Sequence, residues 1–202
     1  MNQRLNEDEV LKNANLLVRK YLGNDTTGHD SLHIERVVAL AKYLAKFEDD
    51  VNLFVIELAA LLHDIEDVKL NHAGSGEVQR FLDENDIPID ERNQIIDIID
   101  NLSYSSTLKG KIERTKEGQI VQDADRLDAL GAIGIARTFA FGGAKGRMIE
   151  GSESATLHHF EEKLLKLEGL MNTREGKRLA RKRTEYIQNF LKQYDSEKNI
   201  RD

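Results

Sequence analysis

Residues 53–64 read LFVIELAALLHD, an apolar run that ends in a histidine followed by an aspartate. Such a run predicts a buried helix, which we place at residues 51–63. His63 shares a helical face with Ile56, so its ring is expected to point inward. Asp64 then brings a carboxylate to the end of the run. Burying an ionised carboxylate costs on the order of several kcal/mol unless a cation or strong donors compensate it. The stretch therefore predicts a central helix with a polar site at its end.

A second inward histidine is expected at position 33. His33 is in line with Val37 and Leu44, on the core-facing stripe of a helix predicted at residues 31–47. A lone inward histidine is more often an ordinary core residue than a ligand. Two of them, one followed by an aspartate at a helix end, favour a site over plain core packing.

Three aspartates interrupt a small and apolar segment at Asp123–Gly131, which reads DADRLDALG. Asp125 and Asp128 are three residues apart and share a helical face. The surrounding alanines and glycines allow close helix packing, which would bring these carboxylates near buried groups. The alternative is a charged outer face, which fits an otherwise apolar helix poorly.

Helical periodicity covers the rest of the chain, which has a single proline and no convincing alternating strand pattern. We therefore expect an all-α protein that forms a single domain over residues 1–202. The expected helices are at residues 5–22, 31–47, 51–63, 75–85, 89–103, 114–140, 155–171 and 174–196. Loops are expected at 24–28 and at 141–146, where three closely spaced glycines end a helix.

The composition excludes several classes of protein. The 202 residues are 40% hydrophobic and 32% charged, as in an ordinary globular protein. The absence of cysteine excludes disulfides, thiolate zinc sites and cysteine nucleophiles, so histidines and carboxylates must hold any metal. A net charge of −7 disfavours nucleic acid polymers and anionic membranes as partners. The N-terminus lacks the apolar core of a signal peptide and residues 54–62 are too short to span a bilayer, so we expect a cytoplasmic location.

Taken together, these segments resemble the HD-domain superfamily of metal-dependent phosphohydrolases. The H…HD…D signature of that superfamily corresponds here to His33, His63-Asp64 and Asp125. The chain is most similar to a bacterial single-domain branch, with HDxxHIxRV at residues 29–37, LLHDIxD at 61–67 and QDADRLDALGAIGIAR at 122–137. The resemblance implies an HD-type helical bundle with a core at about residues 25–140 and C-terminal helices at about 155–196 packed on it.

The resemblance also implies a metal site with positions open to water and substrate. Its ligands would be His33, His63, Asp64 and Asp125, around one divalent ion. Nitrogen and oxygen ligands without sulfur suit Mn²⁺, which we expect, with Co²⁺, Ni²⁺, Fe²⁺ or Mg²⁺ as alternatives.

Related single-metal HD nucleotidases carry a catalytic acidic residue at the place of Asp67. We therefore expect Asp67 to be catalytic, with Glu66 as the second candidate. The alternative is that Asp67 caps a helix or pairs with Lys69.

A phosphorylated substrate needs cations beyond the metal. The residues expected to bind substrate are Arg36, Lys69, His29, Lys145 and Arg147. For His29 the alternative is a cap on the following helix. The glycines at 142–146 could offer backbone N–H groups to phosphate or simply end a helix, and both readings stay open.

The predicted function is hydrolysis of a phosphate or pyrophosphate bond in a small phosphorylated molecule. The resemblance, rather than the chemistry of the residues, makes that molecule a nucleotide, with a nucleoside triphosphate favoured. No nucleic acid polymer or membrane is expected as a partner, and a homodimer stays open. The alternatives are an HD-type phosphodiesterase, an HD-type oxygenase with two irons and a non-catalytic nucleotide-sensing module. The first two need further histidine ligands, and the sensing module would be expected to lack parts of the metal set or Asp67.

Overall fold

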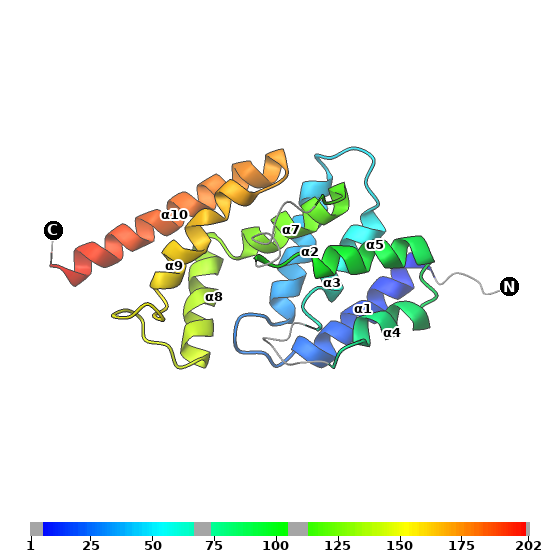
Figure 1. Cartoon of the computed structure of the whole chain (residues 1–202), viewed down its shortest axis with the longest axis horizontal. Coiled ribbons are helices and arrows are strands. Elements are labelled where there is room, and N and C mark those ends of the chain that lie inside the picture. The colour runs from blue at the N-terminus through cyan, green and yellow to red at the C-terminus, as the bar shows by residue number, and fades with distance from the viewer. Residues whose placement is uncertain (1–5, 67–73, 105–112, 201–202) are drawn as a thin grey trace. The chain divides into compact units, whose positions relative to one another are not determined.

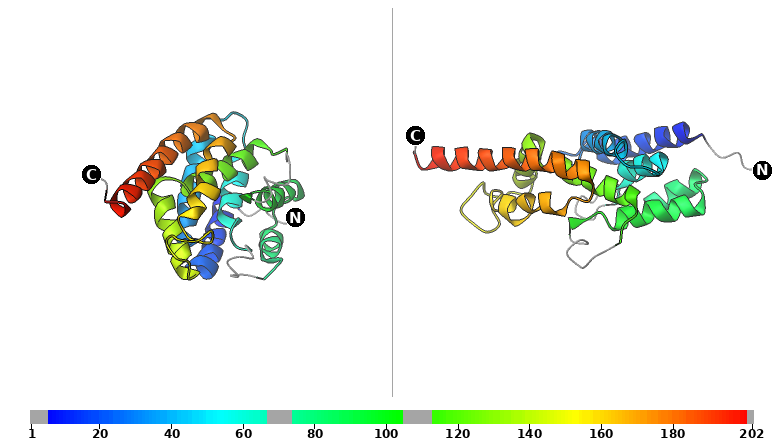
Figure 2. Two further views of the ribbon diagram at one scale, coloured as in Figure 1. Left: turned by 60° about the vertical axis from the view of Figure 1, so that its left-hand side comes forward. Right: turned by 90° about the horizontal axis from the view of Figure 1, so that it is seen from above.

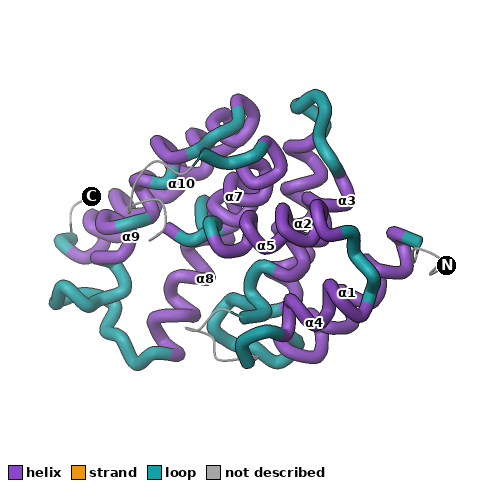
Figure 3. Tube along the Cα trace, turned by 45° about the vertical axis from the view of Figure 1, so that its right-hand side comes forward, coloured by secondary structure: helices purple, strands orange, loops and turns teal. Residues whose placement is uncertain are grey.

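The computed structural model describes residues 6–66, 74–104 and 113–200. Every regular element within these ranges is a helix, and Figure 3 shows no strand among them. The all-α prediction is therefore confirmed for the described part of the chain. Within the same ranges, none of the helices combines the length and the apolar character needed to cross a membrane.

The backbone groups into two compact units. The first unit is made of residues 1–25 and 29–124, and the second unit of residues 26–28 and 125–202. The boundary falls within one helix, α7 (Lys116–Asp128).

Helix α3 lies at the centre of the first unit and packs against α1, α2 and α5 (Figure 1). Apart from Leu53 and Glu57, every residue of α3 is buried, as the apolar run predicts. The helices that lie wholly in this unit are α1 (Glu7–Leu22), α2 (Ser31–Ala45), α3 (Leu53–Leu62), α4 (Glu77–Glu84) and α5 (Ile89–Asp100).

Side-chain caps fix where α2 and α3 begin. The carboxylate of Asp30 accepts a hydrogen bond of 2.8 Å from the backbone N–H of His33. Asn52 does the same for α3, accepting from the N–H of Val55 at 3.2 Å. Its own N–H donates to the buried Glu117 at 3.0 Å. Because caps of this kind satisfy N–H groups that a helix leaves open, they define the first turn of each helix.

The second unit is organised along the long helix α10 (Arg174–Lys198), which contacts α8 and two short 3₁₀ turns (Figure 2). The remaining elements are α8 (Gly131–Ala144), α9 (His158–Glu162), η1 (Leu164–Lys166) and η2 (Glu168–Leu170). The rings of Phe139, Phe160 and Phe190 lie 5.9 to 6.1 Å apart, between centroids, and form an aromatic core. The continuous helix predicted at 155–171 is wrong, since α9 gives way to η1 and η2.

The single helix predicted at 114–140 is also wrong, because α7 and α8 are separate helices. Leu130 is extended, with φ −114° and ψ 161°. Gly131 follows with φ +72°, and a Cβ there would lie 3.2 Å from Cγ of Arg183. An L-residue avoids a positive φ, so glycine both permits the break and lets α10 approach.

The glycine-rich loop begins later than predicted, because α8 continues through Gly142 and Gly143 to Ala144. Gly146, two residues after the last residue of the helix, has φ +65°. The N–H of Gly146 bonds to the carbonyl of Gly143 at 3.1 Å, and that of Arg147 to the carbonyl of Gly142 at 2.8 Å. This pair of bonds is a Schellman motif, a common helix end that needs a residue with positive φ.

Candidate metal centre

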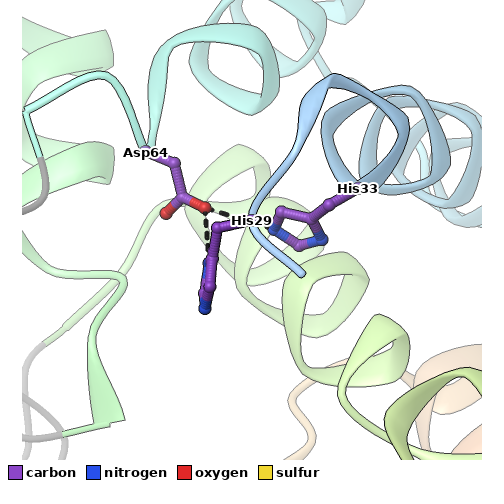
Figure 4. Close-up of side chains that lie close together, drawn as sticks. All are labelled: His29, His33 and Asp64. Carbon is purple, nitrogen blue, oxygen red and sulfur yellow. Dashed lines mark hydrogen bonds and ion pairs between the residues drawn. The ribbon is translucent and has the colours of Figure 1, made fainter. Parts of the chain in front are cut away.

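Two helices and the segment before α2 bring four polar side chains of the first unit together. His33 comes from the first turn of α2, His63 and Asp64 directly follow α3, and His29 precedes α2. We call His29, His33, His63 and Asp64 the histidine–aspartate cluster. Figure 4 shows the Asp64 carboxylate directed at His29 and His33.

The distances within the cluster are short. Oδ2 of Asp64 lies 3.0 Å from Nδ1 of His29 and 3.3 Å from Nε2 of His33. Oδ1 of Asp64 lies 3.3 Å from Nε2 of His63. The ring of His33 lies between the other two rings, with centroid separations of 5.5 Å and 5.4 Å. One carboxylate thus has imidazole nitrogens at both of its oxygens.

Asp64 is buried, yet its surroundings favour the ionised form of its carboxyl group. Its burial would by itself raise the pKa of the carboxyl group, because burial disfavours charge. The contacts with His63, His29 and His33 outweigh that effect and hold the pKa of Asp64 well below its usual range. A buried carboxylate that keeps its charge is a suitable ligand for a cation.

The ring of His63 is oriented by the helix that precedes it. Its Nδ1 lies 2.9 Å from the carbonyl oxygen of Ala60, and a carbonyl only accepts, so Nδ1 carries the proton. The other ring nitrogen, Nε2, faces Oδ1 of Asp64 at 3.3 Å. A histidine whose Nδ1 is bonded to a backbone carbonyl and whose Nε2 faces the site is arranged as metal-binding histidines usually are.

The donor set also fits a metal by composition. The ligand atoms of His29, His33 and Asp64 all lie within 4.8 Å of one another. Imidazole nitrogens and a carboxylate oxygen, without sulfur, suit divalent ions from manganese to zinc. The residues present in the first unit therefore fit a divalent metal ion.

Comparison with known proteins agrees with this interpretation. The model of the HD domain family matches residues 31–130, a span that contains His33, His63 and Asp64. The protein YpgQ of Bacillus subtilis is 38% identical over 186 residues, which cover 89% of each chain. The chain belongs to the HD-domain family.

Solved structures show that the HD-domain similarity extends over nearly the whole chain. A Lactobacillus plantarum protein has a TM-score of 0.86 at 34% identity, covering 99% of this chain and 100% of that one. YpgQ in complex with ADP has a TM-score of 0.80 at 36% identity, covering 95% and 96%. An HD-superfamily hydrolase of Bacillus thuringiensis has a TM-score of 0.75 at 41% identity, covering 96% and 99%.

These similarities confirm the predicted HD-type all-α fold. Together with the histidine–aspartate cluster, they make this HD-domain chain a hydrolase of the HD superfamily with a His/Asp metal site. The ADP in the YpgQ crystal is a property of that relative.

Asp125 and Arg36 are two further residues that were predicted for this HD-domain site. Asp125 is half-buried in the last turn of α7 and belongs to the second unit. It stays a predicted ligand. Arg36 is half-buried on α2, one turn after His33. Asp67 and Lys69 lie outside the described residues.

The two basic residues after α8 belong to the second unit and are exposed. Nζ of Lys145 lies 5.6 Å from the ring centroid of Phe141, and the guanidinium carbon of Arg147 lies 5.5 Å from it. A cation over an aromatic face is attracted to the ring. These contacts hold both side chains against α8, and their part in substrate binding stays a prediction.

Glu66 has a structural role that the sequence did not predict. Helix α4 starts after Gly76, which has no side chain to cap it. Oε1 of Glu66 accepts a hydrogen bond of 2.6 Å from the N–H of Val78, in the first turn of that helix. The carboxylate therefore serves as the missing cap, which also places negative charge at a helix N-terminus.

Sequence reasoning missed Asp25, which supports the segment before α2. Its Oδ1 accepts the backbone N–H of His29 at 3.1 Å. Its place in the loop just before the HDxxH segment could have indicated this role, because short polar side chains commonly form hydrogen bonds with nearby backbone groups.

Sequence reasoning also missed Arg137, whose hydrogen bonds to Gly28 and Asp128 lie within the second unit. Its Nε donates to the carbonyl oxygen of Gly28 at 2.6 Å, and its Nη1 donates to Oδ2 of the fully buried Asp128 at 3.0 Å. The one arginine among the small and apolar residues of α8 could have indicated a buried polar contact. Asp128 thus belongs to a buried ion pair, whose partner the sequence did not identify.

Proposed function

We propose that this HD-domain protein hydrolyses a phosphate or pyrophosphate bond of a nucleotide, with a nucleoside triphosphate as the favoured substrate. The observation that carries the proposal is the buried carboxyl group of Asp64 with imidazole nitrogens at both oxygens. The complex of the relative YpgQ with ADP supports a nucleotide as ligand. ADP contains the type of phosphoanhydride bond that such a hydrolase would cleave in a triphosphate.

We propose one divalent ion at this site, Mn²⁺ first, with Mg²⁺, Co²⁺, Ni²⁺ or Fe²⁺ as alternatives. The proposed ligands are His33, His63, Asp64 and Asp125. The first three are supported by the distances within the cluster, and Asp125 by its place in the family's H…HD…D order. When bound, such an ion polarises a phosphoryl oxygen and lowers the pKa of its water.

The proposed catalytic residue is Asp67, three residues after Asp64. Its carboxylate would accept a proton from the attacking water or donate one to the leaving oxygen. Glu66 is the weaker candidate, because its carboxylate already caps α4.

Cationic side chains are proposed to hold the phosphates. Arg36 is the first candidate, since it follows His33 by one turn and its planar guanidinium matches a phosphate group. Lys69 is the second, with Lys145 and Arg147 as weaker candidates. His29, the remaining residue predicted to bind substrate, has Nδ1 engaged with Asp64.

A nucleotide panel tests the proposal. Metal-stripped protein is incubated with Mn²⁺ and nucleoside mono-, di- and triphosphates, and chromatography separates orthophosphate from pyrophosphate among the products. We expect turnover of triphosphates that requires Mn²⁺ and is lost in His33→Ala. Nucleotide binding without turnover of any member of the panel would contradict hydrolysis and favour the sensing module.

A further inference from the structure

We propose that His29 is a positioning residue for Asp64: it fixes the carboxylate for metal binding instead of contacting the substrate. This inference rests on the metal site of the proposed function. It assigns to His29 a role that the H…HD…D order does not contain.

The contact between the two side chains has a defined direction. Nδ1 of His29 lies 3.0 Å from Oδ2 of Asp64 (Figure 4). A carboxylate that binds a metal ion accepts hydrogen bonds, so in this role Nδ1 of His29 is the donor. Hydrogen bonds to an ionised acceptor are roughly twice as strong as neutral ones. The bond restrains Oδ2, while Oδ1 faces His63.

His29 is itself held from the backbone side. Its N–H donates to Oδ1 of Asp25 at 3.1 Å, and the next residue, Asp30, caps α2 through the N–H of His33. The side chain of His29 is 29% exposed, whereas that of Asp64 is 9% exposed. A fixed donor at the edge of the site, bonded to a buried ligand, is the usual arrangement of an outer residue that orients a metal ligand.

A direct ligand role is the competing possibility. The ligand atoms of His29, His33 and Asp64 lie within 4.8 Å of one another, so distance alone permits it. A ligand nitrogen must offer a lone pair, whereas a nitrogen that positions Asp64 must donate a proton to it. A substitution that removes the hydrogen-bond donor of His29 and one that supplies a different donor therefore distinguish a positioning residue from a metal ligand.

The experiment compares two substitutions of His29 in the full chain. Asparagine can place an amide N–H near the position of Nδ1, whereas leucine keeps bulk without a donor. Titration calorimetry gives the Mn²⁺ dissociation constant of the metal-stripped proteins, and steady-state kinetics give KM for the nucleotide. His33→Ala serves as the ligand reference and His158→Ala, at an exposed histidine of α9, as the control.

We expect His29→Leu to weaken Mn²⁺ binding by about 10–100-fold, the usual effect of losing such an outer partner, and His29→Asn to recover most of the affinity. His158→Ala should bind Mn²⁺ like the wild type. Loss of Mn²⁺ in His29→Asn as complete as in His33→Ala would make His29 a ligand and overturn the inference. A wild-type Mn²⁺ constant in His29→Leu with a raised KM would make it a substrate residue. A wild-type protein that binds no Mn²⁺ would remove the proposed metal site and this inference together, whereas the other two outcomes leave the site standing.

Discussion

The carboxylate of Glu66 lies 2.6 Å from the backbone nitrogen of Val78 and accepts its hydrogen bond. Glu66 and Asp67 both follow the proposed metal ligand Asp64, and this contact uses the carboxylate of Glu66 to cap α4. The other, Asp67, then becomes the stronger candidate for acid–base catalysis, and the two residues can be tested against each other.

Asp67→Asn should bind metal and nucleotide yet turn over at least about a hundredfold more slowly, because general acid–base help is worth roughly 10²–10⁴ in rate. Asparagine keeps the shape of aspartate but cannot exchange the proton. Glu66→Gln is the matched control, since its amide oxygen can still accept from Val78, and it should keep near-normal turnover. The measurements are kcat and the Mn²⁺ dissociation constant. Near-normal turnover in Asp67→Asn would leave Asp67 structural, and loss of the metal would make it a ligand.

Arg36→Ala and Lys69→Ala should each lower kcat/KM by about tenfold or more, the size expected for losing a hydrogen bond to a charged group. The loss falls on KM, kcat or both, according to the state that the contact favours. Lys145→Ala and Arg147→Ala should have smaller effects. Lys192→Ala, at an exposed lysine of α10, is the control. Unchanged kinetics in both Arg36→Ala and Lys69→Ala would place the phosphate subsite elsewhere.

Gly131→Ala should destabilise the protein by about 1–2 kcal/mol, because an L-residue with positive φ is strained and its Cβ would crowd Arg183. Gly143→Ala is the matched control within α8, since among the described residues no atom outside its chain neighbours and its own helix backbone lies within 4 Å of a Cβ at that position. It should be neutral or stabilising by up to about 1 kcal/mol, because alanine is the better helix former. Denaturant unfolding measures both. Equal stability of the two variants would contradict the assigned helix break at Gly131.

Local periodicity was sufficient for much of the fold. The apolar run before His63 predicts a buried helix, and α3 is that helix. The stripe containing His33 and Val37 likewise predicts the buried face of α2. Both histidines are inward because they share a helical face with apolar residues, which a sequence displays directly.

What the sequence did not show depends on contacts between distant residues or on backbone angles. The hydrogen bond between Arg137 and Gly28 joins residues 109 positions apart, and no periodic pattern in the sequence predicts it. The positive φ of Gly131 separates α7 from α8, and the helical periodicity of the segment does not reveal that break. His29 was expected near the site, but its bond to Asp64 required the fold of α3 against the start of α2.

Metal content tests the central claim most directly. Full-length wild type, His63→Ala, Asp125→Ala and the exposed-histidine control His158→Ala are loaded with Mn²⁺, desalted and measured by elemental analysis. The metal site predicts about one ion per chain in the wild type and in His158→Ala, and severe loss in the other two, since each lacks a proposed ligand. Full metal occupancy in both His63→Ala and Asp125→Ala would contradict the assignment.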